Sequence, residues 1–458
     1  MFRPAVFILF LLLNLFVYVV LRRAVLVWVR NQKHQRLALN VLCLSVILIN
    51  IPLGTFFLRE SHLILRQVSP TLLRIFFYPS TAWLATILCF FLLAAPPTMI
   101  WAVVRGLLFV GRTIARQLRE SRAAAAPAAI SASGPALTRR TFLAGSAGLL
   151  IPGIYSVAAY GVYGNLDELD VSKEQATPIP YLPRSLEGLT IVQLSDLHVG
   201  PYIRERDLQY LVSRTNELRP DLVVLTGDIL DWSLESLPDA VRGLSGIQAS
   251  LGVFAVLGNH DIYSDRYSFS AEHRGGVNIV NGLESIGIRT LRNQVIHLGS
   301  GQDRLALMGL DWLGGTPGGR NFYNYQQART QQQLALMDEQ AGPETPRVLL
   351  AHHPDTFTDA IPHGIGLTLA GHTHGGGQVI LGVVNGVPLG PGVFRFKYLS
   401  GLYQEQGCSL YVNRGIGYLG IPIRINCPPE ISRFKLVSPS EVSSPARPSA
   451  RQDSSSQA

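Results

Sequence analysis

The chain has 458 residues, of which 47% are hydrophobic and only 15% charged, and its formal net charge is +8. That charge is unevenly divided, because residues 1–166 carry sixteen Lys and Arg against two acidic residues, whereas residues 167–458 carry twenty-three against twenty-nine. The positive charge therefore belongs to the apolar first part. A DNA- or RNA-binding groove needs its positive charge on the globular part, so no nucleic-acid partner is expected.

Four apolar stretches in the first part are long enough to cross a bilayer, which takes roughly 20 residues. They are residues 4–21, residues 37–58, part of 75–104, and 141–166. The first is short, but it can extend past Arg22 and Arg23 if their side chains reach the membrane surface. Buried helices of a soluble core explain four such stretches poorly. The sequence therefore predicts about four transmembrane helices, three within residues 1–111 and a membrane anchor at 141–166.

The basic loops between these stretches predict an orientation. Loops at 22–36 and 112–140 are strongly basic and are expected in the cytoplasm, whereas the loop at 59–74 is less basic and fits the opposite side. Four crossings then place the amino terminus and the globular part outside the cytoplasm. Loss of one crossing would invert this arrangement.

Residues 112–140 read as a basic cytoplasmic linker, and they end in a possible export signal. Thr138-Arg139-Arg140 followed by Thr141-Phe142-Leu143 resembles a twin-arginine translocation signal, and it fits equally well a basic flank before a transmembrane helix. No small-residue cleavage site follows, so this helix is expected to remain as an anchor.

The second part has the pattern of one large α/β domain. A linker at 167–184 precedes residues 185–437, which hold about ten apolar strand candidates among helical patterns. Covering helices are predicted at 206–218, 237–247 and 326–337. Residues 438–458, rich in Ser and Pro, are predicted to be a disordered tail.

Polar side chains follow five of the predicted strands, at the point where each strand ends. The strands at 189–194, 221–226, 252–257, 347–351 and 365–370 lead respectively into Asp196 and His198, Asp228, Asn259 and His260, His352, and His372 and His374. Ligands of open α/β sheets bind at the carboxyl ends of strands, so these side chains are expected to meet. Glycines beside most of them permit tight turns and close backbone approach.

The donor types predict a metal site. Carboxylate, amide and imidazole donors without a thiolate suit Mn²⁺, Fe or Zn²⁺ better than Ca²⁺ or a structural zinc. Two such ions roughly 3.5–4 Å apart clamp the attacking and leaving oxygens of a phosphoryl displacement and acidify a shared water. Each motif alone is commonplace at a turn. All five in this order, each after an apolar strand, are hard to explain as turns.

The series Asp-Leu-His, Gly-Asp, Gly-Asn-His-Asp, His and Gly-His-Thr-His resembles the calcineurin-like metallophosphoesterase family over about residues 190–435. The resemblance implies a four-layer αββα sandwich and two divalent metal ions. It assigns Asp196, His198 and His374 to the first metal, Asn259, His352 and His372 to the second, and Asp228 to a bridge. It makes His260 the non-ligand histidine that stabilises the transition state or protonates the leaving oxygen.

These features predict a membrane-anchored enzyme of the bacterial cytoplasmic membrane with an extracytoplasmic catalytic domain. We expect attack of a metal-bound hydroxide on a phosphodiester or pyrophosphate of a lipid-linked or envelope substrate. The apolar stretch 378–398, which includes Arg395 and Lys397, could contact lipid, or it could be an ordinary hairpin packed on the sheet. Alternatives are an enzyme for soluble nucleotides and, with less support, a non-catalytic metal-binding module. The oligomeric state is not predicted.

Four other residues have two possible roles each. Arg414 could bind a substrate phosphate through its planar guanidinium, or it could be a surface arginine. Asp261 could orient His260 or act as a structural cap. Cys408 and Cys427 could form a disulfide in an oxidising compartment, or they could remain reduced.

Overall fold

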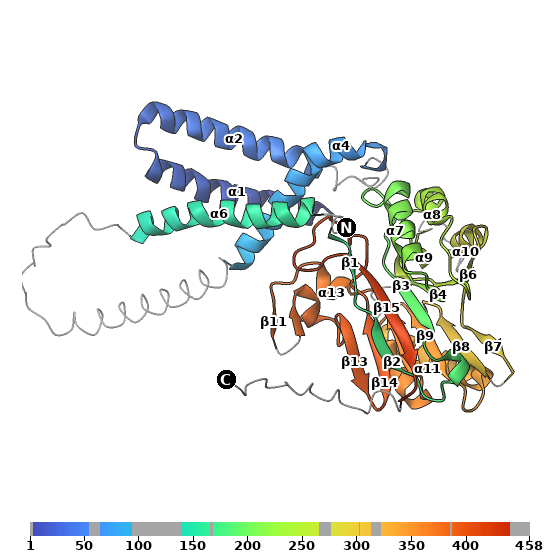
Figure 1. Cartoon of the computed structure of the whole chain (residues 1–458). Helices are drawn as coiled ribbons and strands as arrows, with labels where there is room; N and C mark the ends of the chain where they lie inside the picture. Colours follow the sequence, from blue (N-terminus) through green and yellow to red (C-terminus); the bar gives the residue numbers. More distant parts are fainter. Residues whose placement is uncertain are drawn as a thin grey trace, which may run out of the picture. The chain divides into compact units, whose positions relative to one another are not determined.

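The structure is a computed structural model that describes residues 3–54, 65–93, 139–164, 168–264, 276–301, 303–312, 322–384 and 387–439. It divides into two compact units, Met1–Tyr163 and Gly164–Ala458. The first unit is helical and runs from blue to teal in Figure 1, and the second, from green to red, contains both sheets. Each unit is described by itself.

Three helices of the first unit are long and apolar enough to cross a membrane. They are Val6–Trp28 within α1 (Arg3–Trp28), α2 (Gln32–Gly54), and the helical stretch Pro70–Leu93, which begins with α4 (Pro70–Leu72) and a π-helical turn η2 (Leu73–Phe77). Their length and composition indicate a membrane protein.

The expected fourth crossing is not supported. Its helix, α6 (Arg139–Tyr163), has a described apolar stretch of only Gly148–Tyr163. That is shorter than the roughly 20 residues that a crossing needs. Among the described residues, the predicted four crossings are therefore corrected to three. The first helix continues past Arg22 and Arg23, as the sequence allowed, because α1 ends at Trp28.

Packing in the helical unit is centred on α1, α6 and the Pro70–Leu93 helix. Val17, Trp83, Ile87, Phe90 and Ile151 form a buried cluster. Beside it, Trp83 Nε1 donates to Asn14 Oδ1 at 2.9 Å, while Asn14 Nδ2 donates to the Phe10 carbonyl at 3.0 Å.

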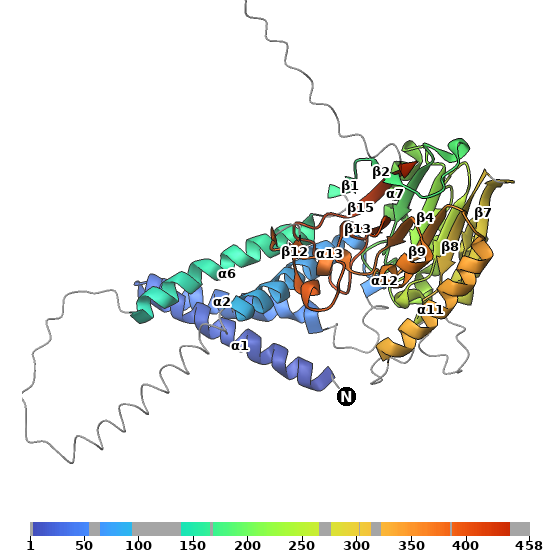
Figure 2. The same cartoon turned by 90° about the horizontal axis from the view of Figure 1, so that it is seen from below.

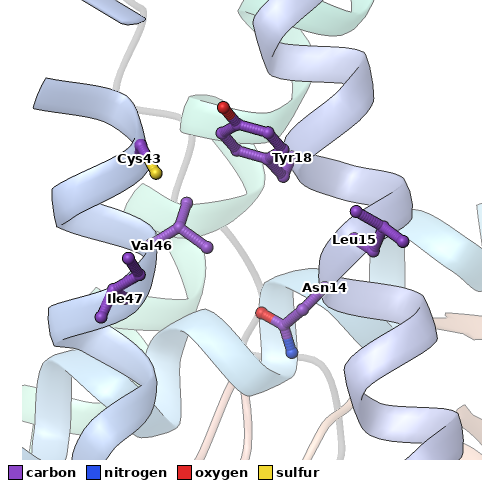
Figure 3. A pocket seen from close by; sticks show the side chains of 6 residues that line it. All are labelled: Asn14, Leu15, Tyr18, Cys43, Val46 and Ile47. Atoms are coloured by element: carbon purple, nitrogen blue, oxygen red, sulfur yellow. The ribbon is translucent and has the colours of Figure 1, made fainter. Parts of the chain in front are cut away.

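A groove of about 200 Å³ lies between α1 and α2 (Figure 3). Its lining residues are Asn14, Leu15, Tyr18, Cys43, Val46 and Ile47. Both polar atoms of the Asn14 side chain are already hydrogen-bonded within the helical unit. The groove therefore presents mainly apolar surface, as expected for helices that face lipid tails.

Two mixed sheets form the centre of the globular unit. The first has the order β1 (Asp170–Val171), β15 (Glu430–Val437), β3 (Thr190–Leu194), β4 (Leu222–Thr226), β5 (Val253–Val256) and β6 (Ile288–Thr290), with β2 (Gln175–Pro178) also paired to β15. The second has the order β13 (Gly401–Glu405), β14 (Cys408–Val412), β10 (Leu367–Ala370), β9 (Arg347–Ala351), β8 (Asp303–Leu310) and β7 (Gln294–Ser300). β3 to β6 are parallel to one another, as are β8, β9, β10 and β14, whereas β15, β7 and β13 each run antiparallel to a neighbour.

Apolar clusters show how the layers are stacked. Side chains from both sheets, including Ile191, Val224 and Val348, form the cluster between the sheets. The outer face of the first sheet packs on helices α7 (Glu205–Glu217), α8 (Leu237–Leu244) and α10 (Val277–Glu284). The outer face of the second packs on α11 (Phe322–Ala341) and α12 (Thr356–Ala360), as Figure 2 shows for α11. The predicted α/β architecture is confirmed, in the order helix, sheet, sheet, helix.

Short single turns complete the described elements. They are the 3-10 turns η4 (Arg184–Leu186), η5 (Leu234–Ser236), η6 (Ile361–His363) and η7 (Pro391–Phe394), and the one-turn helices α9 (Asn259–Ile262) and α13 (His374–Gly377). Both one-turn helices begin at or beside a predicted metal ligand.

Asp221 fastens the start of β4 to β3. Its carboxylate accepts hydrogen bonds from Thr190 N at 2.9 Å, Thr190 Oγ1 at 2.8 Å and Ser250 Oγ at 3.0 Å. Burial alone would raise the pKa of Asp221, but the hydrogen bonds from Thr190 and Ser250 outweigh burial and lower it.

We expect Asp221→Ala to lower the free energy of unfolding by about 1–2 kcal/mol at neutral pH, because these hydrogen bonds are lost. A depressed folded pKa stabilises above the unfolded pKa of about 3.9, and the stabilisation disappears as the pH falls through the folded pKa. Thermal unfolding of the detergent-solubilised chain, followed by circular dichroism, should therefore show a difference that shrinks in acid. Exposed Asp303→Ala is the control. A difference that does not change with pH would contradict the role of the Asp221 charge.

Candidate metal centre

Two groups of predicted metal-donor side chains lie where the loops after β3, β4, β9 and β10 meet, and a third possible donor group joins His198 with Asp231 and His260. Asp196, His198 and His374 form the first group, and Asp228, His352 and His372 form the second. Within each group, one donor atom from every residue lies within 4.8 Å of the others. Except for the half-buried His372, these side chains are buried. Residues separated by up to 178 positions in the chain are thus brought to one edge of the two sheets.

Asp228 lies between the two groups. Its Oδ2 is 3.1 Å from His352 Nε2 in the second group and 3.7 Å from His198 Nε2 in the first. On either side, His198 Nε2 is 2.9 Å from His374 Nε2, and His372 Nδ1 is 3.2 Å from His352 Nε2. A single carboxylate therefore faces donors of both groups, which is the geometry that a bridging ligand needs.

Asn259 is the first residue of α9, and its chain neighbours Gly258 and His260 both lie against Asp228. Its Oδ1 is buried and has no hydrogen-bond partner among the described residues. The following residue, His260, donates its backbone N–H to Asp228 Oδ1 at 2.8 Å. A buried amide oxygen without a partner is costly in a finished fold, whereas it is available as a ligand for a cation.

The donors are aimed by unusual backbone conformations rather than by strand alternation. β3 ends at Leu194, before Asp196 and His198. Asp196, His198, Asp228, His372 and His374 all have positive φ, between 45° and 72°. Non-glycine residues rarely adopt this region, at a cost of about 1 kcal/mol or more each, and such residues cluster at functional sites. Strand geometry, which ends at Leu194, therefore does not set the directions of Asp196 and His198.

The parallel pairing of β3 with β4 continues past the ends of both strands and holds the two loops that follow them in register. Asp196 N donates to the Gly227 carbonyl at 3.0 Å, and His198 N donates to the Asp228 carbonyl at 3.0 Å. At Gly258 an added Cβ would overlap the Asp228 carboxylate, and at Gly371 it would overlap the Asp196 carboxylate. Both glycines are therefore required by close approach to a donor, as the sequence predicted for glycines beside the motifs.

Hydrogen bonds fix the orientation of the donors. Ser195 Oγ donates to Asp196 Oδ2 at 2.6 Å, and His372 N donates to the same oxygen at 3.0 Å. His352 Nδ1 is 2.7 Å from the Thr226 carbonyl. Because a carbonyl only accepts, Nδ1 carries the proton, and Nε2 is the ring atom of His352 that faces Asp228.

Charge is concentrated at Asp228 and His352. Burial would raise the pKa of Asp228, but the imidazoles of His352, His260 and His198 outweigh burial and hold it well below the ordinary value. Burial would lower the pKa of His352, but Asp228 outweighs burial and raises it to about 9. The buried carboxylate is thus kept ionised and attracts positive charge.

Asp231 is a functional candidate that the sequence reasoning missed. Its Oδ1 is 3.4 Å from His260 Nδ1 and 3.6 Å from His198 Nδ1, distances of ionic contact longer than a good hydrogen bond. Burial opposes ionisation of Asp231, but its contacts with His198 and His260 lower its pKa to about 2. The available signal was a second aspartate three residues after Asp228.

His260 itself belongs to the same corner of the site. Its Nε2 is 4.0 Å from Asp228 Oδ2, and its ring centroid is 3.8 Å from that of Trp232 and 4.4 Å from that of His198. Trp232 was also missed, and it limits the freedom of the His260 ring. The structure therefore places His260 beside both donor groups with its Nδ1 towards Asp231.

Asp261 acts on the backbone rather than on His260. Its carboxylate accepts from Gly258 N at 2.9 Å, Ile229 N at 3.1 Å and Leu230 N at 2.9 Å. It thereby ties the loop after β4 to α9. Burial and the charge of Asp228 raise the pKa of Asp261 to about 7. Of the two roles considered for Asp261, the structure shows the structural one.

Arg414 is held by two carboxylates. Its Nε donates to Glu430 Oε2 at 2.8 Å and its Nη2 donates to Asp170 Oδ2 at 2.5 Å. Binding of a phosphate by Arg414 stays a prediction, and it would compete with these contacts.

Cys408 and Cys427 are both buried, and they form no disulfide in the structure.

Aromatic side chains border the second donor group. The Trp312 ring centroid is 5.7 Å from that of His352 and 5.3 Å from that of His372, and Phe396 is 5.3 Å from His372. His353, which belongs to neither donor group, lies against the His372 ring at 4.8 Å. One side of the site is therefore apolar.

Comparison with known proteins agrees with this geometry. The model of the calcineurin-like phosphoesterase family matches residues 189–376. A transmembrane protein with metallophosphoesterase domain from Danio rerio is 33% identical over 287 residues, 61% of this chain and 60% of that protein. A metallophosphoesterase of Helicobacter pylori strain J99 is 31% identical over 271 residues, 58% of this chain and 64% of that protein.

The metallophosphoesterase YkuE of Bacillus subtilis is 31% identical over 313 residues, which are 66% of this chain and 98% of YkuE. The chain thus spans 60% and 64% of the first two relatives and nearly the whole of YkuE. Two mixed sheets that gather His and Asp donors at the ends of their strands define a metallophosphoesterase fold. The chain belongs to the calcineurin-like metallophosphoesterase family.

Proposed function

We propose that the protein is a membrane-anchored phosphoesterase that depends on two divalent metal ions. The observation that carries this proposal is the position of Asp228 between two buried donor groups. The three helices of membrane-spanning length support the anchoring.

The residues fit a pair of cations. Four imidazoles and two carboxylates are crowded at one point, and His198 Nε2 and His374 Nε2 face each other at 2.9 Å. Asn259 Oδ1 is buried without a partner among the described residues. Close packing of donor nitrogens and oxygens is unfavourable without a cation and favourable around one. Mixed nitrogen and oxygen donors suit Mn²⁺, Fe or Zn²⁺, and the donor set alone does not separate them.

In this proposal each donor keeps the role that the family resemblance gave it. Asp196, His198 and His374 would hold one ion, and Asn259, His352 and His372 the other, with Asp228 shared. When bound, the two ions supply positive charge to the phosphate and acidify a water. The chain's own part is to orient the donors through Ser195 and the Thr226 carbonyl, and to keep Asp228 ionised.

His260 is proposed to donate a proton to the leaving oxygen. Its Nε2 faces the site near Asp228, while its Nδ1 faces Asp231 at 3.4 Å. Burial lowers the pKa of His260, and the Asp231 carboxylate opposes this shift by favouring a protonated Nδ1. Asp231 thereby supports the imidazolium that would carry the transferable proton on Nε2. Trp232 covers the ring and restricts its rotation.

For the substrate, we propose a phosphodiester or pyrophosphate that is lipid-linked or part of the cell envelope. Support comes from anchoring in the bilayer and from the apolar side of the site at Trp312 and Phe396. Hydrolysis of soluble nucleotides is the alternative, since it would use the same donors.

The test is hydrolysis by the purified full-length chain in detergent after chelation. We expect less than about 1% of the activity to remain without metal, and Mn²⁺, Fe²⁺ or Zn²⁺ to restore it. The panel should include a phosphomonoester, a phosphodiester, a nucleoside triphosphate and a lipid pyrophosphate. Absence of metal-dependent turnover on all four would overturn the proposal, and preference for the nucleotide would favour the soluble-substrate alternative.

The compartment of the globular unit depends on α6. The extracytoplasmic position predicted from the basic loops required four crossings, and with three crossings the same loops predict the cytoplasmic side. Fusion of alkaline phosphatase or a fluorescent protein to the carboxyl terminus distinguishes these positions. Alkaline phosphatase is active only outside the cytoplasm, whereas a fluorescent protein that is exported unfolded does not fluoresce there and reports the cytoplasmic side.

A further inference from the structure

A small hairpin follows the last metal-donor turn and exposes almost only apolar side chains. β11 (Gly382–Val384) and β12 (Val387–Leu389) pair antiparallel as a separate two-stranded sheet. Leu381 is 78% exposed, Val383 64% and Phe394 94%. Val384, Val387 and Leu389 are also exposed. We call residues 381–394, as far as they are described, the apolar hairpin.

The base of the apolar hairpin is attached to the segment before β15 by hydrogen bonds and to α13 by close packing. Ile380 N donates to the Ile425 carbonyl at 2.9 Å, and Asn426 Nδ2 donates to the Ile380 carbonyl at 2.9 Å. Gly392 approaches the backbone of Gly376 in α13 so closely that a Cβ would overlap it. The exposed strands therefore project from a fixed base, and the alternative of an ordinary hairpin packed on the sheet is wrong.

Exposure on both faces of β11 has to be explained, whereas in β12 the exposed Val387 and Leu389 alternate with the buried Pro388. In a hairpin that packs on a sheet, alternate side chains are buried. Here the adjacent residues Val383 and Val384 are both exposed, at 64% and 53%. A contiguous apolar surface of this kind on a soluble domain marks contact with a partner or a membrane.

Two cations lie directly after the apolar hairpin. Arg395 is exposed, its side chain has no hydrogen bond or ion pair within the described parts of the chain, and its guanidinium lies 5.3 Å from the Phe396 ring centroid. Lys397 is also exposed, 3.7 Å from Glu405. Apolar side chains bordered by Arg and Lys suit a membrane surface, where the apolar groups enter the acyl region and the cations meet phosphate.

Phe396 connects this surface to the metal centre. Its ring lies 5.3 Å from His372 and 5.9 Å from His353. Only one residue separates it from Phe394, which is 94% exposed. A molecule held against the apolar hairpin is therefore adjacent to the second donor group.

We propose that the apolar hairpin inserts into the surface of the bilayer that anchors the chain, with Arg395 at the lipid phosphates, and so presents the metal centre to phosphoesters located in that surface. The bilayer is the occupant that fits, because the chain carries its own membrane helices and α6 packs on two of them through Ile151. Only a short connection separates α6, ending at Tyr163, from β1, starting at Asp170. Fully extended, that connection reaches at most about 25 Å. The substrate part of this inference rests on the proposed phosphoesterase function, whereas the membrane contact does not.

Insertion is tested with a single added tryptophan in the full-length chain. Phe394→Trp and the control Leu336→Trp, at a 46% exposed site on α11, are reconstituted in nanodiscs with and without bromine-labelled lipids. After subtraction of the wild-type signal, we expect the emission of the tryptophan introduced in the hairpin to fall about twofold or more with brominated lipid, and that of the control to be unchanged. Equal quenching of the two variants would overturn the proposal. The proposal would also be overturned if Phe394→Trp forms a dimer in which the introduced tryptophan is shielded from water but not quenched by brominated lipid. That result would show that the apolar hairpin binds a second copy of the chain.

Catalytic consequences are tested with Val383→Asp combined with Phe394→Asp, against Leu336→Asp. We expect turnover of a soluble chromogenic phosphoester to stay within about twofold, and turnover of a phosphoester in nanodisc lipid to fall about tenfold, only for the hairpin variant. Retained soluble turnover also shows that the variant is folded. Equal loss on both substrates, or no loss on lipid, would overturn the substrate part. If the wild type has no metal-dependent turnover at all, the proposed function fails, and the quenching experiment still decides the membrane contact.

Discussion

Asp228→Asn is expected to remove most of the bound metal and to lower turnover by about a thousandfold or more. Residues that merely orient a ligand are worth roughly 10–100-fold in metal affinity or activity, and Asp228 is placed as a direct ligand of both ions. Its Oδ2 faces His352 at 3.1 Å and His198 at 3.7 Å. An amide in its place keeps the shape but carries no negative charge, so two adjacent cations would lose the charge that lies between them.

The measurement is metal content per chain by plasma mass spectrometry, together with initial rates. Asp303→Asn, an exposed change on β8, is the matched control and should keep both. The Asp228 backbone also accepts from His198 N at 3.0 Å, a bond that the substitution leaves in place, so the fold should survive. Normal metal content in Asp228→Asn would contradict a position between two ions.

Most of the metal-donor residues could be predicted because buried apolar strands can be recognised in the sequence. The strands before Asp196, Asp228, His352 and His372 are each short buried runs, and parallel strands deliver their following loops to one edge. The identity of the donors then follows from residue type. Helices on the two outer faces, such as α7 on the first sheet and α11 on the second, were predicted for the same reason, because apolar spacing is local information.

The aim of those donors could not be predicted, because it depends on backbone conformations that tertiary contacts impose. Positive φ at Asp196, His198 and Asp228 runs against the preference of these residues. It persists because β3 and β4 continue their pairing into the loops and because glycines leave room for the carboxylates. Nothing local in the sequence shows that such strain will be outweighed.

Asp231 and Trp232 were missed for a different reason. Both lie in the loop after β4, where a second aspartate or a tryptophan suggests a solvated turn. Their meaning appears only when α9 brings His260 against them, at 3.4 Å from Asp231 and 3.8 Å from the Trp232 ring. The exposure of the apolar hairpin could not be predicted either, since a valine-rich hairpin has the same sequence pattern whether it packs on a sheet or projects into the surroundings.

His260→Ala is expected to lower turnover by about 10²–10⁴-fold while leaving metal content unchanged, because His260 is placed as a proton donor and not as a ligand. A proton donor matters most when the leaving oxygen is strongly basic. The loss should therefore be large for an alkyl phosphoester and much smaller for a p-nitrophenyl phosphoester. His363→Ala, which removes a histidine paired with Asp338 at 2.9 Å, is the matched control and should affect neither substrate.

Asp231→Asn should reproduce this dependence on the leaving group at about a tenth of the effect or less, because we propose that Asp231 positions His260 and stabilises its charge from 3.4 Å. A purely structural role would instead lower both rates equally. Rates on the alkyl and aryl esters, measured with metal content for wild type, His260→Ala, Asp231→Asn and the double variant, separate these cases. In a shared pathway the double variant should be no slower than His260→Ala alone, since the effect of Asp231 passes through that ring. Loss of metal in His260→Ala would place His260 among the ligands. Additive losses of turnover in the double variant would instead give Asp231 a separate role with His198.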